Sequence, residues 1–491
     1  MPPKQTLHPD DFTKDPRVQK VLERLKQHFD PEKNPLVVSD VLDETGQLQF
    51  VNLVQKGGGV LGIALVGYTY ILEEMGIRFL KLAGTSAGAI NTALLTVIGK
   101  KEDKKTDDVL KILCPLDFFS FVDGHPAARW LIKKIITKKD FVTKATNWLL
   151  GFLGICLLLA IADILLLGLS TKFHAYSGWA GGCFILSGFV SLIGGLSLAY
   201  VINLLRRLKN SGFGINPGNT FYDWIKTVMD TNGVQTVSQL KAQAAKCPPL
   251  KLRVDNDYKL TDLKGEVAFI ASELVTQNKI QFPEMTDLFT PHVDSLHPAG
   301  FVRASMSIPV FFESYLINNI PVKDPAILTA WENHFGNDTD IKPAPSARFV
   351  DGGILSNFPI SIFYNPNVTI TRIPTFGIDL DDSKPADKQQ QNPFAWSLTG
   401  YLGRMFNTIR NYYDKDFLIK NEIYRKGIGK VDLSSDQFNW LNFFLTNNDK
   451  IDMFALGAEA AEQFLMQFKW DSYKNERTNW QKSIKNIPPE L

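Results

Sequence analysis

The chain lacks an excess of charge of either sign, and it has few cysteines. Its 491 residues hold 53 Lys and Arg against 51 Asp and Glu, for a formal net charge of +2. This balance gives no reason to expect a nucleic-acid partner. The cysteines at positions 114, 156, 183 and 247 show no C-x-x-C spacing, which argues against a zinc ribbon or a thioredoxin-like site. With 45% hydrophobic residues, the composition also excludes a disordered chain.

Two long apolar runs stand out in a chain whose mean hydropathy is only −0.06. Segments 148–169 and 179–205 each exceed the roughly 20 residues that span a bilayer, and a short link joins them. This pattern predicts a transmembrane helical hairpin. The alternative, a pair of buried soluble helices, requires two apolar helices that are enclosed by protein on all sides. Asp163 is the only charge in the first run; we interpret it as a snorkelling or hydrogen-bonded group in preference to a functional one.

Basic residues flank both runs and indicate their orientation. Several lysines lie within 133–144 and three basic residues lie within 206–209, whereas the link carries only Lys172 and His174. By the positive-inside rule, both ends of the hairpin face the cytoplasm. We therefore expect an integral membrane protein with two spans and with both termini on the cytoplasmic side. The first residues carry no apolar stretch of the kind found in signal peptides.

An alternation of strands, glycine-rich turns and helices precedes the hairpin. The expected elements are a strand at 48–54, a turn at 57–62, a helix at 63–75, a strand at 79–83, a turn at 84–88 and a helix at 89–97. This rhythm is typical of an α/β domain with a parallel sheet.

The second turn fits the G-x-S-x-G pattern of a nucleophile elbow, with Gly84, Thr85, Ser86, Ala87 and Gly88. A serine at a sharp strand-to-helix turn crowds the residues two before and two after it, so small residues are needed there. The start of the following helix also favours developing negative charge. The alternative is a serine that only caps the helix.

The first turn allows two interpretations. Gly57, Gly59 and Gly62 match G-x-G-x-x-G, but the acidic residue that a dinucleotide site needs after the next strand is absent. A P-loop is excluded because no Lys-Ser/Thr follows. The better interpretation is an oxyanion hole, in which the amides of Gly57, Gly58 and Gly59 face a substrate carbonyl oxygen.

A serine nucleophile needs a base, and none of the seven histidines occupies a small-residue or strand-end setting. Asp351 differs, because it ends an apolar strand and is followed by Gly352 and Gly353. A buried carboxylate with a raised pKa is able to accept the serine proton directly. An ordinary turn aspartate before glycine is the alternative.

Together these blocks resemble the patatin-like phospholipases. A fourth block agrees, since Arg303–Pro309 with Phe312 is similar to the A-S-x-x-x-P segment of that family. The resemblance implies a three-layer α/β/α fold with a mainly parallel sheet, to which this chain adds the hairpin as an insertion. It also implies hydrolysis of lipid acyl esters by a Ser–Asp dyad, without a metal or an organic cofactor.

By position, the resemblance makes Ser86 the nucleophile, Asp351 the base and Gly57–Gly59 the oxyanion loop. Leu61 departs from the family, which usually has Arg or Lys there; the difference bears on the orientation of the loop and not on its amides. Ser86 and Asp351 also lie further apart in the chain than is usual, and the inserted hairpin accounts for much of the excess.

The expected organisation has five parts. They are an N-terminal helical extension (1–47), the first part of the patatin-like domain (48–145), the transmembrane hairpin (146–209), the second part of that domain (210–383) and a C-terminal helical region (384–491). The expected function is a membrane-anchored lipid acyl hydrolase of the phospholipase A or lysophospholipase type, with membrane phospholipid and the bilayer as partners. A catalytically inactive lipid-binding or scaffold protein and an acyltransferase remain alternatives, and the oligomeric state stays open.

Overall fold

The computed structural model describes residues 6–137, 141–173, 177–210, 212–254, 263–336, 342–368, 370–381, 398–434 and 438–485. The chain divides into two compact units. The first unit comprises Met1–Val122, Gly218–Pro309 and Ser314–Leu491, and the second comprises Asp123–Pro217 and Val310–Glu313. The five-part organisation expected from the sequence stays a prediction, and its boundary at 383–384 lies outside the described residues.

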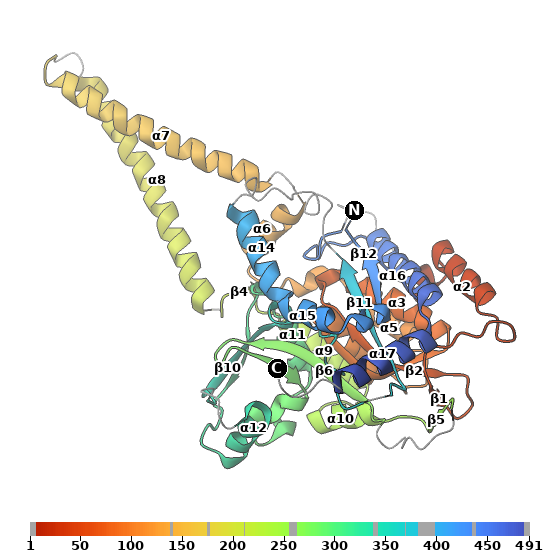
Figure 1. Cartoon of the computed structure of the whole chain (residues 1–491). Coiled ribbons are helices and arrows are strands. Elements are labelled where there is room, and N and C mark those ends of the chain that lie inside the picture. Colours follow the sequence, from red (N-terminus) through yellow and green to blue (C-terminus); the bar gives the residue numbers. More distant parts are fainter. Residues whose placement is uncertain are drawn as a thin grey trace. The chain divides into compact units, whose positions relative to one another are not determined.

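The first unit is built on a mixed sheet with the strand order β12-β11-β2-β3-β6-β10-β9 (Figure 1). The strands are β1 (Val41–Asp43), β2 (Gln49–Gln55), β3 (Ile77–Thr85), β5 (Leu250–Leu252), β6 (Glu266–Glu273), β7 (Asn278–Phe282), β9 (Tyr315–Asn318), β10 (Ser346–Asp351), β11 (Thr375–Asp381) and β12 (Ile428–Asp432). The five strands from β12 to β6 are parallel to one another, whereas β10 pairs antiparallel with both β6 and β9. The predicted fold class, an α/β fold with a mainly parallel central sheet, is confirmed.

Helices of the first unit surround this sheet. They are α1 (Pro9–Thr13), α2 (Pro16–His28), α3 (Ile63–Glu74), α4 (Ala87–Val97), α5 (Thr106–Leu113), α9 (Asn219–Thr231), α10 (Val237–Ala245), α11 (Ala299–Ser305), α12 (Pro325–Phe335), α14 (Leu398–Arg410), α15 (Tyr412–Lys420), α16 (Asn447–Gln467) and α17 (Trp470–Lys485). Local sequence fixes several of their starts. The Asp15 side chain caps α2 ahead of Pro16, and Thr446 and Asp449 form a capping box at α16.

The sheet is covered on both faces. A side chain added at Gly377 of β11 would meet Phe358, and one added at Gly429 of β12 would meet Tyr68 of α3. Gly429 pairs with Ile378, the residue after Gly377, and neighbouring residues of a strand point to opposite faces. Segment 358–363 and α15 therefore lie on one face, and α3 lies on the other.

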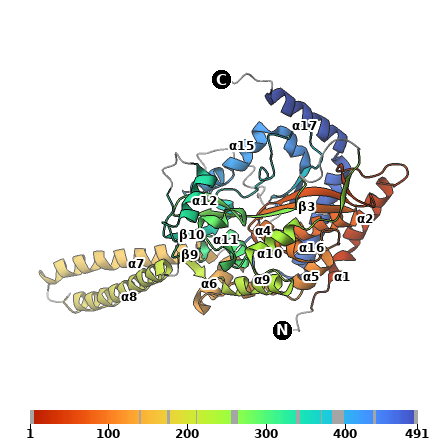
Figure 2. The same cartoon turned by 90° about the horizontal axis from the view of Figure 1, so that it is seen from below.

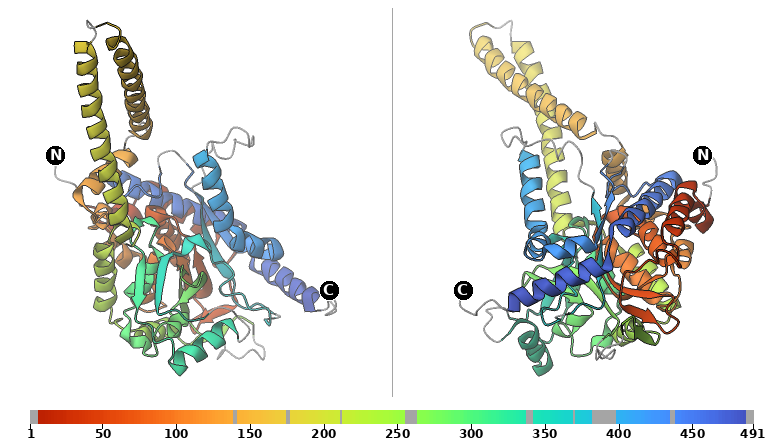
Figure 3. Two further views of the ribbon diagram at one scale, coloured as in Figure 1. Left: turned by 90° about the vertical axis from the view of Figure 1, so that its left-hand side faces the viewer. Right: turned by 45° about the vertical axis from the view of Figure 1, so that its right-hand side comes forward.

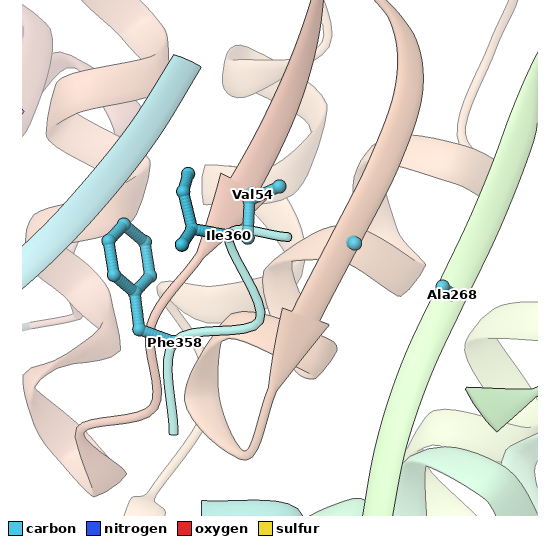
Figure 4. Close-up of a cluster of buried hydrophobic side chains, with 5 residues drawn as sticks. Val54, Ala268, Phe358 and Ile360 are labelled. Carbon is cyan, nitrogen blue, oxygen red and sulfur yellow. The ribbon is translucent and has the colours of Figure 1, made fainter. Parts of the chain in front are cut away.

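One apolar cluster of the first unit lies near the carboxyl ends of β2 and β3. Val54, Ala83 and Ala268, from β2, β3 and β6, form a buried cluster with Phe358 and Ile360 (Figure 4). Every residue of β2 is buried, as expected for a central strand covered on both faces. The same strand ends carry the turns in which the candidate site residues lie.

The second unit contains the two apolar runs. Helix α6 (Pro126–Thr137) precedes α7 (Phe141–Ser170) and α8 (Ser177–Asn210), which pack side by side as a hairpin (Figure 2). Short strands β4 (Gly214–Asn216) and β8 (Val310–Phe312) pair in parallel within the same unit. The apolar segments Leu150–Ser170 and Ser177–Lys209 have mean hydropathies of 2.7 and 2.0 and are long enough to span a membrane. Asp163 of α7 lies beside Cys183 of α8.

Candidate active site

The predicted elbow is a sharp turn between β3, which ends at Thr85, and α4, which begins at Ala87. Between them Ser86 has a φ of 54° and a ψ of −120°, a conformation that a residue with a side chain rarely adopts. A side chain at Gly84 would clash with the backbone of Gly88, and one at Gly88 would clash with the Gln55 carbonyl. Small residues at 84 and 88 are therefore a steric requirement, and the strain at Ser86 matches that of a nucleophile elbow.

A serine from α11 supports the backbone of this turn. The Ser86 N–H donates to Ser305 Oγ at 3.0 Å, and the Ser305 hydroxyl donates to the Ile270 carbonyl at 2.6 Å. Ser305 is fully buried. The sequence showed Ser305 as part of the A-S-x-x-x-P block but gave it no role. Its bonds show that it positions Ser86 relative to β6.

Replacing Ser305 with alanine should therefore impair the turn and not the substrate contacts. The Ser86 N–H would lose its acceptor inside the protein, which costs on the order of 1–3 kcal/mol. We expect kcat on an acyl ester to fall roughly tenfold with KM little changed, and Ser305→Thr, which keeps a hydroxyl, to recover part of the loss. Steady-state kinetics on the three proteins measure this, and an unchanged kcat in Ser305→Ala would contradict the positioning role.

Asp351 lies at the end of β10, opposite Ala271 of β6. Its backbone N–H donates to the Ser307 carbonyl at 2.8 Å, and its Oδ1 accepts the Gly353 N–H at 2.7 Å. The Ser86 side chain lies beside the carboxylate and acts to lower its pKa, and both residues line one pocket. The structure thus brings together two residues that are far apart in the sequence.

Burial decides the acid–base character of Asp351. Removal from water raises the pKa of its carboxyl above the ordinary value, while the adjacent Ser86 side chain, the hydrogen bond from the Gly353 N–H and the charge of Arg410 act in the opposite direction. A raised pKa makes the carboxylate a better proton acceptor than an exposed aspartate. The turn after Asp351 requires glycine at position 352, because a side chain there would clash with the Ile270 carbonyl.

The glycine loop differs from the prediction at its first residue. The Gly57 N–H donates to the Asn357 carbonyl at 3.0 Å. It is therefore not free to bind an oxyanion, and the assignment of Gly57 as a donor is wrong. Among the described residues, the N–H groups of Gly58 and Gly59 have no acceptor. Leu61 is fully buried, so an apolar side chain holds the loop where the family usually has a basic one.

These groups converge on one small pocket of about 60 Å³. It is lined by Gly58, Gly59, Ser86, Asp351 and Gly353, together with Ile308, Pro309, Ile354, Arg410 and Trp440. No histidine of the described part of the chain lines it; His297 and His334 contact Asp230 and Asp287 instead. The pocket thus holds a strained serine, a buried carboxylate and two unengaged backbone N–H groups.

A family model for patatin-like phospholipases matches residues 53–364, which contain all of the predicted catalytic blocks. The chain belongs to the patatin-like phospholipase family. Membership assigns it in general to the lipid acyl ester hydrolases, which act on lipid substrates.

Two other proteins are similar to this patatin-like chain. The uncharacterized protein YqhO of Bacillus subtilis is 24% identical over 421 residues, covering 86% of this chain and all of its own length. The crystal structure of VipD from Legionella pneumophila aligns at 12% identity with a TM-score of 0.35, over 91% of this chain and 73% of that one.

Arg410 is a pocket residue that the sequence did not reveal. It is the last residue of α14 and lines the pocket of this patatin-like domain beside Ser86 and Asp351. Within the described part of the chain, its guanidinium forms no hydrogen bond or ion pair, and its Nε is buried. Its charge lowers the pKa of Asp351. No local motif marks Arg410, since its place depends on how α14 packs after the sheet is formed.

Removal of this charge should shift the pH dependence of the reaction. Asp351 must be ionised to act as a base. Without the charge of Arg410 the pKa of Asp351 rises further. As the pH falls, Asp351 is then protonated at a higher pH, and activity is lost there. We expect the acid limb of kcat/KM to move to higher pH in Arg410→Met, and not in Lys415→Met, which removes an exposed cation from α15. An unchanged acid limb of the kcat/KM profile in Arg410→Met would show that the guanidinium does not lower the pKa of Asp351.

Asp414 of α15 supports the loop that holds Gly57. Its carboxylate accepts the Ser356 hydroxyl at 2.7 Å and the Phe358 N–H at 2.8 Å. Asn357, between these two residues, accepts the Gly57 N–H. Burial raises the pKa of Asp414 to about 6. The carboxylate therefore links α15 to the glycine loop, and its distance from the motifs in sequence explains why it was missed.

Within the described ranges, no group of three or more His, Cys, Asp or Glu side chains is placed to hold a metal ion. The chemistry of the pocket is that of a serine, a carboxylate and backbone amides.

Proposed function

We propose that this chain is a membrane-anchored serine hydrolase that cleaves the acyl esters of phospholipids through Ser86 and Asp351. The observation that carries the proposal is the juxtaposition of the strained Ser86 and the buried Asp351 in one pocket, which Gly58 and Gly59 also line. Family membership supports the lipid ester as the substrate class.

In the first half of the reaction, Ser86 Oγ attacks the acyl carbonyl carbon while its proton passes to Asp351. The carbonyl oxygen becomes an oxyanion that accepts hydrogen bonds from the Gly58 and Gly59 N–H groups. When this intermediate collapses, the ester C–O bond breaks and the leaving alcohol takes the proton from Asp351. An acyl-enzyme ester on Ser86 remains.

In the second half, water attacks the acyl-enzyme and gives its proton to Asp351. Collapse of the second intermediate releases the fatty acid, and Ser86 recovers the proton. One carboxylate serves both halves, since it is regenerated each time. An acyltransferase would follow the same path with an alcohol in place of water.

The hairpin anchors the catalytic domain at the membrane. Helices α7 and α8 are long and apolar enough to cross a bilayer, and the flanking basic residues favour cytoplasmic ends. An anchored domain meets its substrate at the membrane surface, where phospholipid is already concentrated.

The test is hydrolysis by the full chain in detergent or vesicles, across phospholipids, lysophospholipids and neutral glycerides, each compared with Ser86→Ala. Ser86-dependent release of fatty acid from phospholipid supports the proposal. Acyl transfer to added lysolipid or glycerol, without free fatty acid, would identify an acyltransferase. No Ser86-dependent turnover on any substrate would identify an inactive lipid-binding protein.

A further inference from the structure

An apolar stripe follows α14, the helix whose last residue lines the active-site pocket. Tyr401, Met405 and Ile409 are 53%, 47% and 58% exposed, and their four-residue spacing places them on one face of the helix. Tyr412 and Tyr413, each 62% exposed, continue the apolar surface at the start of α15. Helix α14 extends away from the sheet and leads directly into α15 (Figure 3). We call these five side chains the α14 face.

Such a surface is unusual on a water-soluble domain. Exposed apolar residues are normally scattered, whereas a contiguous group on one helix marks an interaction site. The opposite side of α14 carries the polar, exposed Asn407. The helix contains Arg404 and Arg410 and no acidic residue. An apolar face combined with basic residues is the pattern of helices that lie in the interface of a membrane.

The small size of the active-site pocket also indicates contact with a membrane. At about 60 Å³ it is far below the roughly 300–1,000 Å³ of pockets that enclose a whole drug-sized ligand. It has room for the ester group, and most of a lipid substrate must remain outside it. The acyl chains then need an apolar environment close to the pocket, and α14, which carries the α14 face, ends at the pocket residue Arg410.

We propose that the α14 face docks on the lipid leaflet and holds the pocket at its surface, so that a lipid ester reaches Ser86 while its chains stay in the bilayer. The inference rests on the proposed function for its substrate, but the docking itself does not require catalysis. It assigns α14 a contact with lipid that is separate from the anchoring by α7 and α8.

The contact can be measured directly on the full chain. Benzoylphenylalanine is placed at position 405 or, as the control on the polar side, at position 407, both in the Ser86→Ala background. The protein is reconstituted into vesicles of phosphatidylcholine and phosphatidylglycerol and irradiated. We expect lipid adducts from position 405, several-fold more than from position 407. Equal adducts from both positions, no lipid adduct from 405, or an adduct of protein mass from 405 would overturn the proposal, the last by identifying a second copy as the partner.

A kinetic test separates docking from chemistry. In Met405→Glu/Ile409→Glu, the ratio of vesicle phospholipid hydrolysis to hydrolysis of a water-soluble short-chain ester should fall roughly tenfold, because loss of two apolar contacts weakens interfacial binding. Asn407→Glu, which adds a charge on the polar side, should leave the ratio unchanged. An unchanged ratio in the double variant would overturn the inference. If no substrate shows Ser86-dependent turnover, the proposed function fails, and the crosslinking experiment alone decides the docking.

Discussion

Replacement of Ser86 by alanine is expected to lower phospholipid hydrolysis by roughly 10⁴- to 10⁶-fold, the loss seen when a serine hydrolase is deprived of its nucleophile. The reason is chemical, since no acyl-enzyme can form without the hydroxyl. The fold should persist, because alanine keeps the backbone N–H that donates to Ser305. Fatty-acid release measured with excess substrate gives the effect.

The matched control for this prediction is Ser483→Ala, which removes an exposed hydroxyl from α17. This variant should hydrolyse lipid at the normal rate. Circular dichroism of both variants checks that each retains the secondary structure of the parent. Turnover in Ser86→Ala comparable with that of the parent would mean that another residue attacks the ester.

Asp351→Asn should lower the rate by roughly 10³- to 10⁴-fold, the range found when a catalytic carboxylate is replaced by its amide. Asparagine has almost the same shape and keeps an oxygen that is able to accept the Gly353 N–H, so the turn after β10 should survive. It has no basicity, so the Ser86 proton has no acceptor. Raising the pH should not restore the rate, because the amide does not ionise.

Asp416→Asn serves as the control for Asp351→Asn, since Asp416 lies on α15 and pairs with Lys420 at the surface. We expect an almost normal rate from it. A normal rate in Asp351→Asn itself would redirect the search for the base to the histidines, none of which lines the pocket among the described residues.

Local sequence was sufficient to predict the central strands and helices. Apolar runs such as 48–54 and glycine-rich turns such as 84–88 have few alternative conformations, and the structure places β2 at Gln49–Gln55 and α4 directly after Ser86. The direction of β10 could not be predicted in this way. Its antiparallel pairing with β6 depends on the path of the chain between them and not on its own residues.

The candidate site likewise contains residues that local sequence predicts and residues that it does not. Ser86 and Asp351 were predicted as site residues because the chemistry requires small neighbours, which the sequence displays. The error at Gly57 arose because the acceptor of its N–H, the Asn357 carbonyl, comes from a distant segment. Arg410 and Asp414 had no local signal, because each reaches the site only through the packing of α14 and α15.

The most direct test of the account is reaction of the folded full chain with a fluorophosphonate ester, followed by mass spectrometry of its peptides. Such esters modify only a serine whose hydroxyl is activated. The account predicts one adduct, on Ser86, which is absent from Ser86→Ala and strongly reduced in Asp351→Asn. A chain that folds and inserts but takes no label at Ser86, or takes it equally well without the Asp351 carboxylate, would contradict the dyad.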